Sequence, residues 1–431
     1  MLAVSRRAPR DPATVLSPMP AAAPTPDPPP SADARLPRTA WALGWVSLFM
    51  DMSSELVHAV LPVYMSSVLG LSLLTIGLVE GVAEATASLL KLVSGAWSDR
   101  LGRRKSLAVL GYGLSALTKP LFPLASGAAE LIAARLLDRV GKGIRGAPRD
   151  ALLADATPPE LRNAAYGLRQ SMDTVGAFLG PLAAIVLLGW MPGHLRGVLW
   201  FGVLPALLAV GVLVLAVREP PTRLDPGAPA GARPAARRLP RLYEARHLPR
   251  AYWMVVLTAG IFTLARLSEA FLVLRGRQLG LSLHWVPLVT LGFSLVYALS
   301  AYPAGLLAQR RGRAPLLAAG MAVLLASMLA LAAGGLPGLW LGVALYGLHL
   351  GLTQGVFAAA IAATAPAELR GSAFGAYYLV TGVLQLLAGL GAGWLWQDFG
   401  ATAAFGAGAL LAAAALAMSL LARAWNGPPQ A

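Results

Sequence analysis

The feature that most constrains this chain is a series of long apolar stretches separated by short polar segments. A helix needs about 20 mostly apolar residues to cross the hydrocarbon core of a bilayer. Twelve stretches of the 431-residue chain reach this length, and the one at 129–153 is the most polar of them. They lie near residues 40–69, 74–97, 106–126, 129–153, 163–189, 196–217, 251–274, 285–308, 314–334, 339–363, 372–396 and 401–423.

The overall composition supports the same class. The chain is 57% hydrophobic and only 13% charged, whereas an average soluble domain carries about 25% charged residues. It has no cysteine, which excludes disulfides and thiolate metal sites. The net charge of +15 comes mainly from Lys and Arg in the segments between spans, which orients a membrane protein and does not indicate nucleic-acid binding. We therefore expect an all-α integral membrane protein with twelve transmembrane helices.

The distribution of basic residues predicts the orientation. With the N-terminus in the cytoplasm, the opposite side keeps only Arg196, Arg275 and Arg277 outside the spans, so both termini are expected to be cytoplasmic. We expect a multi-pass protein of the cell inner (plasma) membrane. The predicted organisation is a disordered cytoplasmic tail at 1–38, for which a transit peptide is the alternative, then a six-helix bundle at 39–217, a basic cytoplasmic linker at 218–250, a second six-helix bundle at 251–424 and a tail at 425–431.

The two predicted bundles resemble each other in sequence. "LGLSLLTIGLV" at 69–79 matches "LGLSLHWVPLV" at 279–289, an offset of 210 residues. "PPELRNAAYG" at 158–167 matches "PAELRGSAFG" at 366–375, an offset of 208. Matching segments also have the same sidedness, as in repeats related by an axis along the membrane normal. We predict two copies of one six-helix unit with a site between them.

Three motifs indicate which family the chain resembles. "GAWSDRLGRRK" at 95–105 is similar to the signature between helices two and three of the Major Facilitator Superfamily, and "GLLAQRRGRAP" at 305–315 to its weaker second copy. "RVGKGIRGA" at 139–147 resembles the family's fourth-helix motif. "GAFLGP" at 176–181 resembles the start of a fifth-helix motif often seen in exporters, although its trailing glycines are replaced by Ala184 and Ile185. The resemblance covers residues 40 to 424 and implies a twelve-helix secondary transporter.

The first signature implies a cytoplasmic gate. In the family, its acid latches helix two to helix eleven when the cytoplasmic side is closed, and Asp99 stands in that position. The alternative is that the basic residues act only as topology determinants. The gate candidates are Gly95, Asp99, Arg100, Gly102, Arg103 and Arg104.

Titratable residues inside the first span suggest proton coupling. At about 100° per residue, Asp51, Glu55 and His58 fall within about 60° of one another on one helix face. Two acids one turn apart repel each other unless one of them is protonated, and His58 could share that proton. Asp173 in the fifth span is a further proton-coupling candidate.

Other charged residues at bilayer depth predict a wet cavity, because isolated charges there cost a few kcal/mol. The alternative is that pairs such as Arg135 with Asp138, or Arg169 with Asp173, only satisfy each other and fix helix register. Tyr377 and Tyr378 could touch substrate, but core packing is the more frequent role of such residues. The cavity candidates are Glu84, Arg135, Arg139, Lys142, Arg169, Arg266, Glu269, His349 and Gln354.

These observations predict a secondary transporter of a small organic solute that works by alternating access. We expect proton coupling and slightly favour export. The alternative is proton-coupled uptake of an organic anion or phosphorylated metabolite, and a membrane-embedded enzyme is a rival of another class. No phosphate-binding loop is present, which argues against ATP-driven transport. We expect no cofactor, no metal, no nucleic-acid partner and a functional monomer in the lipid bilayer.

Overall fold

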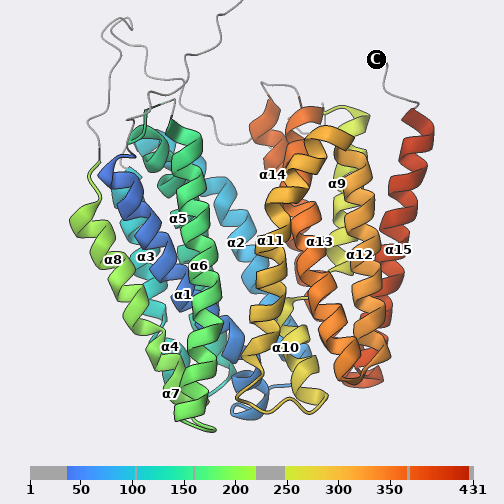
Figure 1. Cartoon of the computed structure of the whole chain (residues 1–431), viewed down its shortest axis with the longest axis horizontal. Coiled ribbons are helices and arrows are strands. Elements are labelled where there is room, and N and C mark those ends of the chain that lie inside the picture. Colours follow the sequence, from blue (N-terminus) through green and yellow to red (C-terminus); the bar gives the residue numbers. More distant parts are fainter. Residues whose placement is uncertain (1–35, 102–103, 159–160, 220–247, 366–368, 427–431) are drawn as a thin grey trace, which may run out of the picture. The chain divides into compact units, whose positions relative to one another are not determined.

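The computed structural model describes residues 36–101, 104–158, 161–219, 248–365 and 369–426, and its regular elements are α-helices (Figure 1). Residues 220–247 are called the central segment, and the helices before and after it are called the first and second helix sets. The first set is α1 (Arg38–Ser67), α2 (Leu73–Leu101), α3 (Arg104–Thr118), α4 (Leu121–Leu124), α5 (Ala128–Asp155), α6 (Arg162–Trp190), α7 (Leu195–Phe201) and α8 (Val203–Ala216). The second set is α9 (Arg250–Ala265), α10 (Glu269–Gln278), α11 (Pro287–Arg311), α12 (Arg313–Ala333), α13 (Gly335–Thr364), α14 (Arg370–Phe399) and α15 (Ala401–Asn426).

Each of the twelve predicted spans coincides with one helix or with two consecutive helices. Within the described ranges, eleven of these units are long and apolar enough to cross a membrane. The exception is α5, the most polar predicted span, which has 28 residues but carries a row of charged side chains. Its length would suffice at about 1.5 Å per residue. Its packing against α2 and α3 shields that row from the surface.

Three spans that we predicted as continuous are interrupted. Lys119 and Pro120 form a turn between α3 and α4, and Gly202 separates α7 from α8. Residues 266–268 separate α9 from α10, where Ser268 caps α10 by accepting a hydrogen bond from the backbone N–H of Ala270. The break between α9 and α10 matters for the site, because the backbone and side chains of residues 266–268 are outside a helix and free to face inward.

Helices of the two sequence halves make parallel sets of contacts. Before the central segment, α1 packs against α6 and α8, and α3 packs against α5 and α8. After it, α9 packs against α14 and α15, and α12 packs against α13 and α15. The two sets meet mainly where α2 packs on α14 and α6 packs on α11 (Figure 1).

Glycines bring α2 and α14 into backbone contact. A Cβ atom added to Gly77 would overlap the carbonyl oxygen of Gly389, and one added to Gly81 would lie 3.0 Å from the Cα atom of Leu386. A Cβ atom added to Gly393 would lie 2.5 Å from the carbonyl oxygen of Leu73. Small residues allow this approach in membrane helices. The tightest contact between the two sets therefore lies in the first third of α2 and the second half of α14.

Segments that match in sequence also match in backbone conformation. Gly70 and Gly280, 210 residues apart, both have a positive φ, at 62° and 95°. Leu161 and Leu369, 208 residues apart, precede α6 and α14 with φ values of −99° and −103°. Pro37 and Pro249 precede α1 and α9 with nearly the same φ and ψ.

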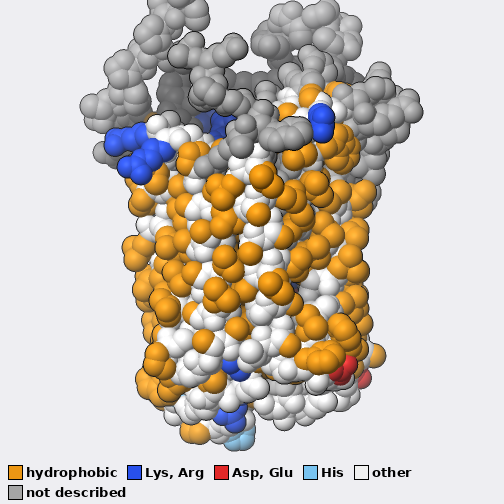
Figure 2. Space-filling model, turned by 90° about the vertical axis from the view of Figure 1, so that its right-hand side faces the viewer, with side chains coloured by type: hydrophobic (Ala, Val, Ile, Leu, Met, Phe, Trp, Pro, Cys, Tyr) orange, Lys and Arg blue, Asp and Glu red, His pale blue; other side chains and the backbone are white. Residues whose placement is uncertain are grey.

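The outer surface between the two ends of the helices is apolar. Hydrophobic side chains cover the middle of the face shown in Figure 2, and charged side chains appear near its two ends. Among the exposed large side chains are Leu215 at 86%, Trp190 at 78% and Leu410 at 76%. A surface of this kind suits contact with lipid.

Several predicted segments lie wholly or partly outside the described residues. These include the N-terminal tail up to residue 35, residues 220–247 of the linker and the last residues from 427. Gly95, Asp99 and Arg100 belong to the last turns of α2, whereas Gly102 and Arg103 lie outside the described residues. Arg104 begins α3, and its guanidinium pairs with Asp155 and donates to the carbonyl of Ala151 on α5.

Candidate functional site

A cavity of about 500 Å³ lies between the two sets of helices. Ligand pockets commonly have volumes of about 300–1,000 Å³. From the first set it is lined by α1, α2 and α5, and from the second by α9 to α11, α13 and α14. Eight sequence candidates line it: Glu55, His58, Glu84, Arg135, Lys142, Arg266, Glu269 and Gln354.

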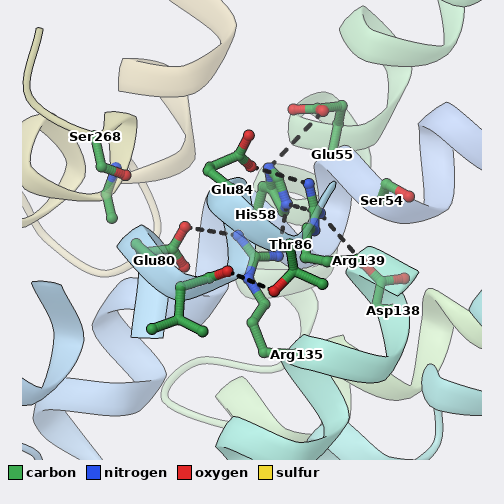
Figure 3. A network of polar contacts seen from close by, with 12 residues as sticks. Ser54, Glu55, His58, Glu80, Glu84, Thr86, Arg135, Asp138, Arg139 and Ser268 are labelled. Atoms are coloured by element: carbon green, nitrogen blue, oxygen red, sulfur yellow. Dashed lines mark hydrogen bonds and ion pairs between the residues drawn. The ribbon is translucent and has the colours of Figure 1, made fainter. Parts of the chain in front are cut away.

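The side of the cavity formed by α1, α2 and α5 is called the charged wall, and His58 lies at the centre of its polar contacts. Its Nε2 atom lies 2.6 Å from a guanidinium nitrogen of Arg135 and 2.6 Å from one of Arg139 (Figure 3). A guanidinium has only donors, so Nε2 must accept both hydrogen bonds. The ring proton is therefore on Nδ1, which faces the Glu55 carboxylate at 3.9 Å. In this state the His58 ring is neutral, and its Nδ1–H group faces Glu55.

Two ion pairs tie α5 to α2 beside this histidine. Arg135 donates to Glu80 at 2.7 Å, and Arg139 donates to Glu84 at 3.1 Å (Figure 3). The side chains of Arg135 and Glu80 are almost fully buried, at 2% and 6% exposure. Charged hydrogen bonds of this kind are stronger than neutral ones. The acids of α2 and the arginines of α5 thus form one bonded unit.

A second row of charges lies directly behind the wall. Asp138 accepts from Arg139 at 3.2 Å and from Lys119 at 2.9 Å, and Lys119 also donates to Ser54 at 3.3 Å. The side chains of Lys119 and Asp138 are only 1% and 3% exposed. Lys119 was not among the sequence candidates, although it lies within the predicted span at 106–126. The signal that could have found it is the adjacent Pro120, which ends α3 before the span is complete.

The suggested pairing of Arg135 with Asp138 is wrong. The two residues are three apart on one helix, but Arg135 reaches across to Glu80 on α2 and Asp138 binds Lys119 beyond α3. Partners on neighbouring helices compete with partners on the same helix, and here they prevail. The suggested pair of Arg169 and Asp173 is present on α6.

Arg169 and Asp173 belong to a different cluster that does not line the cavity. Arg149 approaches Asp173 at 3.9 Å and donates to Asp150 at 3.0 Å and to Ser47 at 3.2 Å. Arg169 also lies 3.6 Å from Asp150. This cluster ties together α1, α5 and α6, so the structure places these two candidates among helix-joining contacts.

Three further candidates are also absent from the cavity lining. Arg139 has a fully buried side chain and contacts the cavity only through its partners Glu84 and His58. Asp51 is partly buried on α1, one turn before Glu55. His349 is fully buried behind the opposite wall, where its ring packs against Phe262 and Tyr346 at 5.9 Å and 4.6 Å.

The opposite wall is mainly aromatic and hydroxylic. Phe262 packs against Phe357 with ring centroids 5.5 Å apart, and Tyr377 packs against Tyr378 at 5.4 Å; all four line the cavity. The charged residues of this wall are Arg266, in the break between α9 and α10, and Glu269, at the start of α10. Core packing was the expected role of Tyr377 and Tyr378, and their place at the cavity required the tertiary structure.

The fold is that of a multi-span membrane protein with a cavity between two sets of helices, and sequence comparison gives the family. The family model of the Major Facilitator Superfamily matches residues 43–283 and 268–431. The chain belongs to the Major Facilitator Superfamily, which confirms the resemblance found in its motifs. It is a transporter and not an enzyme.

Three relatives illustrate the range of similar proteins. An uncharacterised transporter of this superfamily from Methanocaldococcus jannaschii is 30% identical over 372 residues, which are 85% of this chain and 90% of the relative. The fosmidomycin resistance protein of Escherichia coli is 26% identical over 275 residues, 63% of this chain and 65% of the relative. A probable 4-methylmuconolactone transporter of Cupriavidus pinatubonensis is 31% identical over 183 residues, 40% of each chain.

A solved structure shares the fold. A bacterial homologue of the human lysosomal transporter Spinster, in an inward-facing and unoccupied conformation, superposes with a TM-score of 0.71 at 16% identity. The superposition covers 89% of this chain and 96% of the other.

Proposed function

We propose that the chain is a secondary active transporter that moves a small organic solute across the inner membrane by alternating access, coupled to protons. The observation that carries this proposal is the cavity of about 500 Å³, because residues of both helix sets line it. A site shared between two bundles can be exposed to either side as the bundles rock about it.

The proton would be carried by the carboxylate of Glu55. It lines the cavity with a side-chain exposure of 21%, and its nearest cationic candidate, His58, is neutral in the arrangement above. Glu80 and Glu84, by contrast, are each bonded to an arginine. A carboxylate without a bonded cation loses less favourable electrostatic interaction energy when it is protonated. Asp51 and Asp173, which do not line the cavity, are the alternative proton-coupling candidates.

The proposed direction is export. Similarity to a fosmidomycin resistance protein and the exporter-like "GAFLGP" at 176–181 support it. The alternative is uptake of an organic anion, which is favoured by Lys142 and Arg266 in the cavity lining and by similarity to a probable 4-methylmuconolactone transporter.

The proposed arrangement is two six-helix repeats, at 39–217 and 251–424, with both termini and the linker in the cytoplasm. The parallel helix contacts and the matching conformations of Gly70 and Gly280 support the repeat. The glycine contact between α2 and α14 would then close the extracytoplasmic side. Gly95, Asp99, Arg100, Gly102, Arg103 and Arg104 would form the cytoplasmic gate, and the monomer would be the working unit.

Proteoliposomes that contain the pH-sensitive dye pyranine test the function without a labelled substrate. Compounds would first be selected by growth of a host that expresses the chain, on toxic compounds and on sole carbon sources. Each selected compound would then be added outside the vesicles. A change in internal pH that requires the protein, and that disappears with Glu55→Gln, supports proton-coupled transport. Compound movement without any proton flux would refute the coupling.

A further inference from the structure

Four charged side chains of the cavity stand apart from the bonded network. Within the described residues, Lys142, Arg266 and Glu269 have no opposite charge within 4.0 Å, and Glu55 has only the neutral His58 at 3.9 Å. All four line the cavity. The other charged lining residues, Glu80, Glu84 and Arg135, each have a bonded partner.

These four residues form a balanced set across the interface. Glu55 and Lys142 come from α1 and α5 of the first helix set, and Arg266 and Glu269 come from the α9–α10 break of the second. Each side of the cavity thus offers one acid and one cation that lack a bonded counter-charge.

When the cavity closes and water leaves it, each of these charges needs a counter-charge, because isolated charges at bilayer depth cost a few kcal/mol. An anionic substrate would satisfy Lys142 and Arg266 but would repel Glu55 and Glu269. A cationic substrate would do the reverse. A molecule with one negative and one positive group can satisfy both kinds at once and keep the set neutral.

We propose that the substrate is a zwitterion with an aromatic or otherwise flat apolar body. This inference rests on the proposed transport function. The carboxylate or phosphate of the substrate lies toward Lys142 and Arg266, and its ammonium group lies toward Glu55 and Glu269. Its apolar body packs on the wall of Phe262, Phe357, Tyr377 and Tyr378, which are four of the aromatic side chains that line the second half of the cavity.

Four synthetic probes with one shared body test the charge requirement: biphenylalanine, biphenylpropionate, biphenylethylamine and biphenylpropanamide. They are zwitterionic, anionic, cationic and neutral, respectively. The concentration of each probe that gives a half-maximal rise in the melting temperature of the purified full chain measures relative affinity. We expect biphenylalanine to bind at least about tenfold more tightly than each of the other three, as an extra 1.4 kcal/mol of binding free energy would give.

Charge-removing variants assign the two ends. Lys142→Met and Arg266→Met should weaken biphenylalanine about tenfold but should not weaken biphenylethylamine, which the removed cation repels. Glu269→Gln should weaken biphenylalanine but should not weaken biphenylpropionate, which the removed carboxylate repels. Arg277→Gln and Glu130→Gln remove the same charges from exposed residues outside the cavity lining, and the order of the four probes should persist in them.

A single-charge probe that binds as tightly as biphenylalanine would overturn the inference, and so would failure of biphenylalanine to stabilise the chain. Pyranine vesicles separate this from the proposed function. Proton flux driven by biphenylpropionate or biphenylethylamine alone would leave the transporter standing and refute the zwitterion. The expected binding order without any proton flux would support the zwitterion and refute the coupling.

Discussion

The two walls of the cavity come from the two sets of helices and differ in chemistry. The wall of α1, α2 and α5 presents the charged groups of Glu80, Glu84 and Arg135, which direct contacts join through His58 and the buried Arg139. The wall of α9 to α11, α13 and α14 presents aromatic rings and hydroxyl or amide groups, and among its lining residues only Arg266 and Glu269 are charged.

This difference indicates a division of labour between the walls. Bonded charges that join three helices resist rearrangement, because losing one partner strands another buried charge. Aromatic rings offer a large apolar contact area that does not depend on a charged partner. We therefore interpret the charged wall as the fixed, ion-handling side and the aromatic wall as the side that accepts the body of the substrate.

The largest expected effect comes from removing a charge behind the charged wall. Asp138→Asn leaves Lys119, with a side-chain exposure of 1%, without its carboxylate. Breaking a buried pair in this way costs about 3–5 kcal/mol. We expect most of the protein to disappear from the monodisperse peak in fluorescence-detected size-exclusion chromatography.

Two further variants make this result interpretable. Asp155→Asn breaks the more exposed pair with Arg104, and such pairs contribute about 0–1 kcal/mol, so its peak should remain. The double variant Lys119→Met with Asp138→Asn should recover part of the lost protein, because the stranded ammonium is gone. If Asp138→Asn and Asp155→Asn gave equally large monodisperse peaks, the buried charges behind the wall would not be needed for folding.

The next effect concerns the proton and divides two neighbours on α1. Glu55 lines the cavity, whereas Asp51 does not. Glu55→Gln should reduce accumulation of a substrate against its gradient at least about tenfold while exchange at equilibrium persists, since the carrier still moves but no longer takes a proton. The measurement is uptake into proteoliposomes under an imposed pH gradient.

Asp51→Asn is the matched control in the same assay, and we expect accumulation to stay within about threefold of the unmodified chain, a difference below 1.4 kcal/mol. Loss of accumulation in Asp51→Asn with a normal Glu55→Gln would move the proton site one turn along the helix, away from the cavity.

Much of the architecture could be predicted from the sequence. The length of an apolar stretch and the residues of a motif are properties of single segments. The first predicted all twelve helical units, including the polar α5, and the second indicated the family. The polar face of α1 was also predicted, and the structure places Glu55 and His58 from it on the cavity.

The partners of the charged residues could not be predicted in the same way. A helical periodicity gives the direction of a side chain about its own axis but not the helix that faces it. Arg135 therefore seemed able to pair with Asp138, although its partner is Glu80 on another helix. Lys119, Tyr377 and Tyr378 were missed or undervalued for the same reason, since only tertiary packing brings Lys119 to Asp138 and the two tyrosines to the cavity.

A smaller effect compares one arginine from each wall. Arg139 bonds Glu84, Asp138 and His58 at once, which requires a planar group with several donors. Arg139→Lys keeps the charge but cannot maintain all three contacts, and we expect the transport rate to fall about tenfold while the protein still folds. Arg266 has no ion pair within 4.0 Å among the described residues. Arg266→Lys should therefore change the rate less than about threefold. Equal losses in both variants would contradict the distinction between a bonded and an open wall.

The contact between the walls offers a prediction of several-fold size. On α14, a Cβ atom at Gly389 would meet the backbone of Gly77 and Gly81, whereas a Cβ atom at Gly391 would meet nothing within 4 Å. Gly389→Ala should cost about 1–3 kcal/mol by overpacking and should push α14 away from α2. We expect greater labelling of a single cysteine introduced near the crossing, and slower transport. Gly391→Ala is the control and should behave as the unmodified chain; increased labelling in it as well would mean that small residues are needed along the whole helix.

The smallest expected effect tests how the aromatic wall holds its polar groups. Tyr297 on α11 donates a hydrogen bond of 3.1 Å to the side-chain oxygen of Gln354, which lines the cavity although Tyr297 does not. A neutral hydrogen bond contributes about 0.5–1.5 kcal/mol. Tyr297→Phe removes the hydroxyl, so the Gln354 amide can rotate, and we expect the half-saturating substrate concentration to rise about two- to fourfold at an unchanged maximal rate. Tyr302→Phe removes a hydroxyl from a side chain that is 75% exposed on the same helix and should leave both parameters unchanged. If Tyr297→Phe instead lowers the maximal rate and leaves the half-saturating concentration alone, this tyrosine acts on the movement of the helices and not on the orientation of Gln354.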